Sequence, residues 1–538
     1  MPSSSSSSPS SSRFAAGVLA AGAIAGVLAA VPYKAFDLDR YFVPKELALL
    51  ATATLAAAAC LGGAKRLTLS VADLALAAFL AVSIISALFA GNWWLASRAL
   101  GVSLGGAAVY WSAKSLARGG LARAVLIGVA CAVTVAALTS LAQAYGIESV
   151  YMSVNRAPGG TLGNRNFVAH LAAIGVPLIV LCTLEARSAL GALAGAGASL
   201  VLSAALFMSR SRGAWLALAA SVLVIAIFGF LGRARWRDAP RARRFTLLIV
   251  AAIIGALAAW LVPNTLDWNS TSPYLDSVRG VVNYKEGSGK GRVVQYKNTL
   301  LMAHAHPILG VGPGNWPVQY PRYAPRTDPS LDRDTGMTAN PWPSSDWMAA
   351  LGERGMPAVA LLLLAVIAIA LGAVRGMWRS RDATEFLRSL ALLATLTATM
   401  IVGAFDAVLL LALPTLIVWA ALGALSPPAP DAARVVALSD AARPRLVVTA
   451  LLAGLLLCAR SAMQLYAMQQ FSAGDKIATI ERASHADPGS YRIHMRLAEA
   501  YSAKRSCADV KTHAGAAQHL FPNAPAPRRL LATCGVRK

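Results

Sequence analysis

Runs of apolar residues recur along the whole chain and are separated by short polar segments. A helix that crosses a bilayer needs about 20 predominantly apolar residues, so each run predicts one membrane span. We expect an all-α polytopic membrane protein of about 12 to 13 transmembrane helices, depending on whether the runs beside Phe405 form two helices. The expected spans are 14–31, 47–62, 70–90, 98–113, 124–145, 167–184, 189–207, 214–231, 245–262, 346–374, 389–404, 406–425 and 445–466.

The longest polar interruption runs from Tyr284 to Gly355, within a predicted outer loop at 263–345. Loops of more than about 12 to 15 residues are usually functional or disordered. Three tryptophans lie among its Gly-Pro turns, and apolar residues recur at helical spacing between Val293 and His304. We therefore expect this loop to fold and to carry the function.

The two ends of the chain differ from its middle. Residues 1–13 are rich in serine and predict a disordered leader. The first apolar run lacks a small-residue cleavage site, so it is expected to remain as the first span of a membrane domain at 14–466. Residues 467–538 contain alanine-rich helical pairs that fit one or two tetratricopeptide-like repeats. This tail would either bind a periplasmic protein partner or cap the membrane domain as a plain helical hairpin.

Composition excludes an ordinary soluble domain, because 57% of the residues are hydrophobic, 14% are charged and the mean hydropathy is +0.56. The net charge of +24 would suggest a nucleic-acid partner only in a soluble chain. Lys and Arg gather in cytoplasmic loops of membrane proteins. They follow that rule here at Lys65 and Arg66; at Lys114, Arg118 and Arg123; at Arg233, Arg235, Arg237, Arg241, Arg243 and Arg244; and at Arg375, Arg379, Arg381 and Arg388. We therefore expect a cytoplasmic N-terminus, a periplasmic central loop and C-terminus, and no nucleic-acid partner.

Cysteine and histidine give no metal-site pattern. Four of the six cysteines lie in predicted spans, whereas Cys507 and Cys534 both lie in the outer tail. In an oxidising compartment these two either form a disulfide or stay free. His304 and His306 lack a third ligand nearby, so no metal site is predicted there.

Two acidic pairs and one glycine-rich run partly match the motifs of nucleotide or metal sites. The run GSGKGR lacks the glycine and the Ser or Thr that a phosphate-binding loop requires. Asp332 and Asp334 have the spacing of a metal-bound nucleotide-sugar site, but nucleotides are scarce outside the cytoplasm. Asp37 and Asp39, in the first outer loop, would hold a divalent metal or simply face solvent.

Arginines gather at the predicted outer ends of the spans. Arg210 and Arg212 stand among small residues in MSRSRGAW, Arg156 and Arg165 flank another outer entrance, and Arg292 opens the central helix. Such residues often anchor a helix end at the headgroup level. The small neighbours of the first pair instead leave room for an anion, and guanidinium groups bind phosphate oxygens in pairs.

The chain resembles the O-antigen ligase and polymerase family of bacterial envelope glycosyltransferases. The resemblance rests on RAPGGTLGNRNFVAH, SRSRGAW, GRVVQYKNTLLMAHAHPILGVGPGNW and SSDWMAALGERG, and it covers most of the membrane domain. It implies a GT-C-like helical bundle in the bacterial inner membrane. It also implies an undecaprenyl-diphosphate-linked glycan donor and inverting transfer on the periplasmic face, without metal or other cofactor. The acceptor would be a lipid A-core or another glycan.

The family's two functional arginines fall on Arg212 and Arg292. Its His-Asn pair is replaced here by Ser344 and Ser345, whereas the glycine that follows is kept as Gly355 and the next one is Ala358. Serine needs another base to be deprotonated. Either Asp346, Glu353, His304 or His306 would act as the base, or a base would be only weakly needed because the leaving group is already stabilised. Further substrate contacts are expected from Arg156, Asn164, Arg165, Asn166, Arg210, His306, Ser344 and Ser345.

The resemblance leaves the type of transfer open. Ligation to a lipid core, polymerisation on the carrier and transfer to protein all use the same donor. A flippase for lipid-linked glycan is the competing class, but transporters usually carry ionisable residues at mid-membrane. Here Asp73 and Asp406 are among the few ionisable residues within the predicted spans, and polar residues gather on one face.

Overall fold

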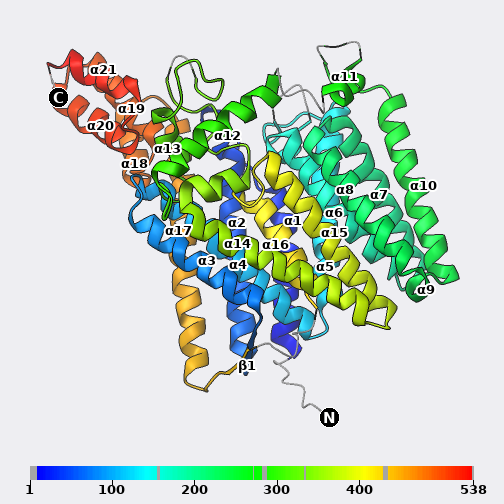
Figure 1. Cartoon of the computed structure of the whole chain (residues 1–538). Coiled ribbons are helices and arrows are strands. Elements are labelled where there is room, and N and C mark those ends of the chain that lie inside the picture. Colours follow the sequence, from blue (N-terminus) through cyan, green and yellow to red (C-terminus); the bar gives the residue numbers. More distant parts are fainter. Residues whose placement is uncertain are drawn as a thin grey trace.

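The computed structural model is almost entirely helical, and it describes residues 9–153, 158–268, 270, 272–280, 287–332, 335–427 and 434–535. Long helices form a bundle. The N-terminus of the chain lies on one face of the bundle, and shorter helices cover the opposite face (Figure 1). Within the described residues, eleven helices are long and apolar enough to cross a membrane, which confirms the all-α polytopic class. They are α1 (Pro9–Leu28), α2 (Asp39–Gly63), α3 (Val71–Leu88), α5 (Ala122–Ala144), α6 (Arg165–Leu184), α7 (Ala189–Ser209), α8 (Arg212–Leu231), α10 (Ala239–Leu261), α14 (Asp346–Arg379), α15 (Ala383–Phe405) and α17 (Ala442–Ser472).

Two further predicted spans correspond to α4 (Trp93–Arg118) and α16 (Ala412–Leu425). Helix α16 has only 14 residues, and all of them are buried. Basic residues of α4 are neutralised by acidic neighbours, because Arg98 binds Glu46 at 2.7 Å and Lys114 binds Asp73 at 2.7 Å. Pairing of this kind is how charged residues are accommodated inside a bundle.

The N-terminal leader is shorter than predicted. Helix α1 starts at Pro9, so the predicted disorder of 1–13 is wrong for residues 9–13, and residues 1–8 lie outside the described part. Extending an existing helix costs far less than starting one, which explains the helical serines. Leu19 and Ala23 of α1 are buried, and α1 packs against α2 and α5 as part of the core.

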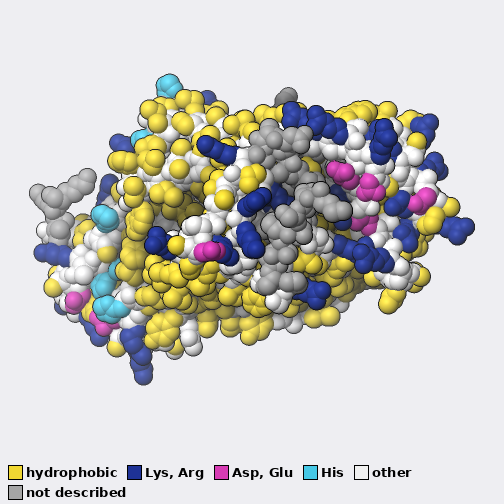
Figure 2. All heavy atoms as spheres, turned by 90° about the horizontal axis from the view of Figure 1, so that it is seen from below, with side chains coloured by type: hydrophobic (Ala, Val, Ile, Leu, Met, Phe, Trp, Pro, Cys, Tyr) yellow, Lys and Arg dark blue, Asp and Glu magenta, His cyan; other side chains and the backbone are white. Residues whose placement is uncertain are grey.

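A short antiparallel ribbon that was not predicted lies on the N-terminal face. Strand β1 (Arg66–Leu69) pairs with β2 (Arg434–Ala437), with Arg66 opposite Ala437. The small helix α9 (Arg233–Trp236) lies on the same side of the bundle (Figure 1). Seen from below, this face carries many more basic than acidic side chains (Figure 2). The distribution agrees with the basic loops on which the topology was predicted.

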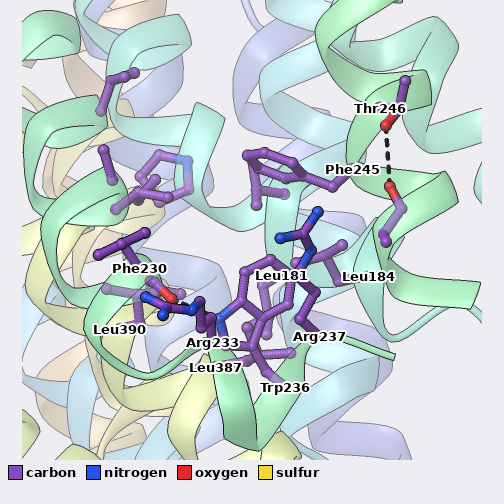
Figure 3. A pocket seen from close by; sticks show the side chains of 18 residues that line it. Leu181, Leu184, Phe230, Arg233, Trp236, Arg237, Phe245, Thr246, Leu387 and Leu390 are labelled. Carbon is purple, nitrogen blue, oxygen red and sulfur yellow. Dashed lines mark hydrogen bonds between the residues drawn. The ribbon is translucent and has the colours of Figure 1, made fainter. Parts of the chain in front are cut away.

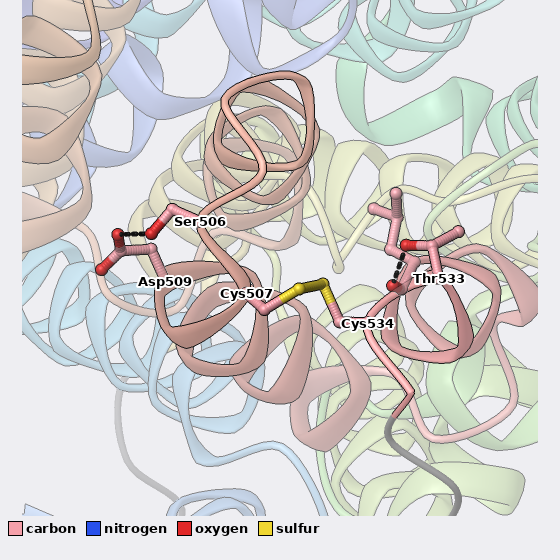
Figure 4. The surroundings of a disulfide bond; sticks show 6 residues. Ser506, Cys507, Asp509, Thr533 and Cys534 are labelled. Atoms are coloured by element: carbon pink, nitrogen blue, oxygen red, sulfur yellow. Dashed lines mark hydrogen bonds between the residues drawn. A yellow bond between two sulfur atoms is a disulfide. The ribbon is translucent and has the colours of Figure 1, made fainter.

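The tail forms four helices: α18 (Ile477–Ala486), α19 (Tyr491–Ala503), α20 (Cys507–Leu520) and α21 (Pro525–Thr533). A disulfide between Cys507 and Cys534 ties the start of α20 to the end of α21 (Figure 4). The tail is also fastened to the outer loops. The Asn92 side chain donates a hydrogen bond to the Leu520 carbonyl at 3.1 Å, and the Asn523 side chain donates one to the Val318 carbonyl at 2.9 Å.

Candidate functional site

The central loop is folded, as its length and tryptophans predicted. It contains α11 (Pro273–Arg279), α12 (Gly287–Ala305), α13 (Trp316–Gln319) and the 3-10 turn η4 (Tyr320–Arg322). Met302, Val311, Trp316 and Tyr320 form a small core of its own. The Trp316 indole donates to Thr299 Oγ1 at 3.0 Å, and the Tyr320 hydroxyl donates to Asp328 Oδ2 at 2.8 Å. Burial and this hydrogen bond both raise the pKa of Tyr320.

Helix α12 is attached to the segment that precedes α14. Gln295 Oε1 accepts a hydrogen bond from the Ser344 backbone N–H at 2.6 Å. The Tyr296 hydroxyl lies 2.6 Å from the Ser344 carbonyl oxygen and 2.7 Å from that of Ala404. Residues one turn earlier on α12, including Arg292, are thereby held beside Ser344 and the end of α15.

The chain returns from α12 onto the start of α14 through a close backbone contact at Gly355. This residue has φ 82°, and a side chain there would approach the Ile308 carbonyl oxygen to 2.2 Å. Only glycine tolerates both conditions. The Met356 N–H donates to the Pro307 carbonyl at 2.8 Å, and the Val311 N–H donates to the Gly352 carbonyl at 3.0 Å. The GERG run at residues 352–355 therefore joins the central loop to the membrane domain.

A cavity of about 330 Å³ opens between α6, α12 and the segment before α14. It brings together side chains predicted from separate motifs, since Arg292, Asn164, Asn166 and Ser344 all line it. Nε of Arg292 is buried and has no hydrogen-bond partner within the described residues. A buried N–H without an acceptor is costly, and an anionic ligand would supply an acceptor for Nε of this half-buried arginine. The other lining residues are Leu38, Phe167, Gly287, Ser288, Gly291, Gln295, Pro329, Ser330, Ala339, Asn340, Trp342 and Asp406.

Arg212 reaches the edge of the Arg292 cavity. It is the first residue of α8, and its guanidinium donates to Ser288 Oγ at 2.7 Å and to the Gly280 carbonyl. Ser288 lines the cavity, so Arg212 contacts a residue of the cavity wall. Two arginines from distant parts of the chain thus lie at or beside the same cavity.

Arg165 and Arg210 lie nearby but are held by Trp268. Their guanidinium carbons lie 5.4 Å and 4.5 Å from its ring centroid, respectively. Arg210 also donates from Nε to Ser277 Oγ at 2.8 Å. Burial lowers the pKa of Arg210, while nearby Asp276 acts in the opposite direction; arginine nevertheless stays protonated at neutral pH. These two residues are better placed to order the loop than to contact a ligand in the cavity.

Asp406 also lines the cavity, although it was predicted only as an ionisable residue within a span. It follows α15 directly and is the single carboxylate among the residues that line the cavity. Its Oδ1 accepts the Ala407 N–H at 2.9 Å, whereas Oδ2 lies 4.0 Å from Nε2 of buried His170. Nδ1 of His170 has no partner within the described residues. Asp406 is therefore placed to accept a proton from a group bound in the cavity.

Ser345 and Asp346, two of the predicted site residues, are engaged in the fold. Ser345 is the N-cap of α14, and its Oγ accepts from the Trp347 N–H at 3.2 Å and donates to the Gly403 carbonyl at 3.1 Å. The Asp346 carboxylate accepts from the N–H groups of Val408 and Leu409 at 3.0 Å. Asp346 thereby satisfies the backbone N–H groups of the segment between α15 and α16, and its carboxylate has little capacity left for a substrate.

Glu353 lines a second, smaller cavity of about 90 Å³. Its Oε1 accepts from the Trp316 N–H at 3.3 Å, so it binds the loop onto α14. Asp39, Glu46, Arg98 and Arg354 line the same cavity, and Trp342 belongs to both cavities. Glu353 is thus separated from the Arg292 cavity by the Trp342 indole.

The remaining predicted residues lie away from the cavity or outside the described part. His304 and His306 are exposed at the opposite end of α12 from Arg292, roughly 20 Å along the helix axis. His306 Nε2 is 3.2 Å from the Tyr323 hydroxyl. Arg156 lies outside the described residues, as do Arg333 and Asp334 of the second acidic motif.

The Asp37 and Asp39 carboxylates are bound by arginines. Arg492 of the tail lies 3.2 Å from Asp37, and Arg98 lies 2.8 Å from Asp39. Across the described ranges, no three His, Cys, Asp or Glu side chains come together as metal ligands would. The first outer loop is thereby tied to the tail and to α4.

Residues 197–363 match the family model described as O-antigen ligase. The matched segment begins within α7, contains the central loop and ends within α14, so it includes Arg212 and Arg292 but not Asn164, Asn166 or Asp406. The chain matches no curated protein.

Proposed function

We propose that the chain, whose residues 197–363 match the O-antigen ligase family model, transfers a glycan from undecaprenyl diphosphate to an acceptor at the Arg292 cavity. The match and the eleven long apolar helices support a multi-pass inner-membrane glycosyltransferase of surface polysaccharide biosynthesis. The observation that carries the finer proposal is the buried, unpartnered Nε of Arg292 in a cavity bordered by Arg212.

The donor's diphosphate would bind Arg292 and Arg212. Breaking the bond between the anomeric carbon and the diphosphate oxygen leaves negative charge on undecaprenyl diphosphate. Fixed cations placed where charge develops stabilise that transition state more than the ground state. Asn164 and Asn166 line the same cavity and offer amide groups to sugar hydroxyls or phosphate oxygens. The carrier's polyprenyl chain would extend into the bilayer.

Asp406 is the group in this proposal that receives the acceptor's proton. The acceptor oxygen attacks the anomeric carbon from the side opposite the diphosphate, forms the new glycosidic bond and loses its proton to Asp406 Oδ2. Asp406 replaces the base that Ser344 cannot supply. Asp406 lines the Arg292 cavity, whereas Asp346 and Glu353 do not.

The acceptor is proposed to bind beside Trp342, which lines both cavities. Its ring contacts Phe42 and Phe167 at centroid distances of 5.1 Å and 6.3 Å. A half-buried indole at this point suits contact with a sugar ring. Lipid A-core ligation remains the lead, with polymerisation or transfer to protein as alternatives that use the same donor site. The docked tail favours recognition of a large acceptor or a protein partner.

The proposal requires the Arg292 cavity to face the periplasm. In a variant without the four unpaired cysteines, Lys290→Cys should react with a membrane-impermeant thiol reagent in intact cells. Arg237→Cys, beyond the opposite end of α8, should react only after permeabilisation. Reaction of Arg237→Cys in intact cells would invert the topology and contradict the proposal.

Metal removal should leave transfer unchanged. Asp37 and Asp39 are bound by arginines, and the proposed chemistry uses cationic side chains in place of a metal. Activity in membranes should therefore be equal with and without EDTA. Loss of activity that returns with Mg²⁺ or Mn²⁺ would move the reaction to the first outer loop.

Deleting the gene and analysing the envelope distinguishes the types of transfer. A ligase leaves uncapped lipid core and long carrier-linked chains, a polymerase leaves single repeat units, and a protein glycosyltransferase leaves unglycosylated proteins. Precursor trapped on the cytoplasmic face would instead indicate a flippase and would overturn the proposal.

A further inference from the structure

A second large cavity, of about 410 Å³, lies at the other end of the membrane domain from the Arg292 cavity. Its size falls within the range of about 300 to 1,000 Å³ that is usual for small-molecule sites. Helix α8 connects the two regions: Arg212 begins it, and after 20 residues, about 30 Å, the chain reaches Arg233. The lining is apolar over most of its depth and comes from α6, α8, α10 and α15, including Leu181, Phe230, Phe245 and Leu390.

Basic and aromatic side chains from the α8–α10 connection stand around this cavity (Figure 3). The Trp236 indole donates to the Gly229 carbonyl at 2.8 Å and packs edge-on against Phe245 with 6.0 Å between ring centroids. Arg233 lies over the Phe230 ring at 4.2 Å, and Arg237 extends beside Trp236. Within the described part of the chain, neither guanidinium forms a salt bridge.

We propose that this cavity binds an anionic phospholipid, with one acyl chain among the four helices and the phosphate at Arg233 and Arg237. Three features support this occupant. The walls are apolar, the two guanidinium groups lack carboxylate partners, and tryptophan with arginine at a helix end marks the headgroup level of a bilayer. Basic pockets between transmembrane helices bind anionic lipid headgroups in this way.

The site is separate from the proposed glycan transfer. About 30 Å of membrane lies between Arg233 and Arg212, so one diphosphate cannot reach both regions. The binding is therefore tested without any measurement of transfer, and either proposal can fail alone.

Native mass spectrometry of the purified full-length protein tests the inference directly. With added phosphatidylglycerol the protein should retain one lipid, whereas phosphatidylcholine should be retained far less. In a variant with both Arg233→Ala and Arg237→Ala, retention of phosphatidylglycerol should fall roughly ten- to thirtyfold. Arg243→Ala, an exposed arginine at the start of α10 that does not line the cavity, should retain the lipid as the wild type does.

A second pair of variants tests occupancy of the cavity itself. Ala226 lines it, whereas Leu223 lies on the exposed surface of the same helix. Ala226→Trp should block lipid retention and Leu223→Trp should not, with thermal unfolding confirming that both are folded. Equal retention in all variants, or equal retention of the two lipids, would overturn the inference. Stronger retention of undecaprenyl phosphate than of phosphatidylglycerol would also overturn it by identifying the carrier as the occupant.

Discussion

Replacing Arg292 with alanine should lower the rate of glycan transfer about a hundredfold or more, because its guanidinium stabilises charge on the departing diphosphate. Arg212→Ala should have an effect of the same order, since Arg212 borders the same cavity through Ser288. The measurement is transfer of lipid-linked glycan in membranes that contain equal amounts of each variant. The loss should appear in kcat/KM, as expected for a contact made in the transition state.

The matched control for this prediction is Lys297→Ala, which removes an exposed positive charge from the same helix. Arg165→Ala and Arg210→Ala should have milder effects, because Trp268 holds both side chains away from the cavity. Small and equal losses at Arg292, Arg212 and these controls would show that the arginines only anchor helix ends at the membrane surface.

Asp406→Asn should lower kcat by about a hundredfold to ten-thousandfold, the usual contribution of a positioned general base. Asparagine keeps the size of the side chain and can still accept the Ala407 N–H, so the protein should fold normally. The measurement is the rate of transfer at saturating donor in membranes that contain equal amounts of wild type and variant.

Asp346→Asn is the contrasting variant. Its carboxylate accepts N–H groups from the segment between α15 and α16, so its loss should reduce stability and leave the kcat of the folded fraction largely unchanged. If Asp346→Asn abolished transfer in a stable protein while Asp406→Asn stayed active, the proton acceptor would have been misassigned.

The membrane architecture could be predicted because hydrophobicity acts locally. Nearly every long apolar run became a helix, since a backbone in lipid must satisfy its own hydrogen bonds. The β1–β2 ribbon could not be predicted, because its two strands come from distant loops and have only four residues each. Helix α1 starts earlier than predicted because the serine-rich residues 9–13 extend the helix that the following apolar residues form.

The candidate site was predictable only in part. Arg292, Asn164, Asn166 and Ser344 come from motifs noted in the sequence, and the structure places them around one cavity. Asp406 was seen only as a charge within a span, because nothing local shows that α15 ends there beside α12. Ser345 at a helix start is a common N-cap, so its structural role could have been inferred from the sequence alone. The contact between Glu353 and Trp316 depends on how the loop folds back, which no local pattern encodes.

The central claim, glycan transfer at the Arg292 cavity, is tested most directly with purified protein in liposomes that contain an undecaprenyl-diphosphate-linked oligosaccharide and an acceptor lipid. We predict that the wild type releases undecaprenyl diphosphate and attaches the oligosaccharide to the acceptor in equal amounts, and that Arg292→Ala does neither at a comparable rate. Movement of the intact donor between leaflets without release of diphosphate would contradict the account.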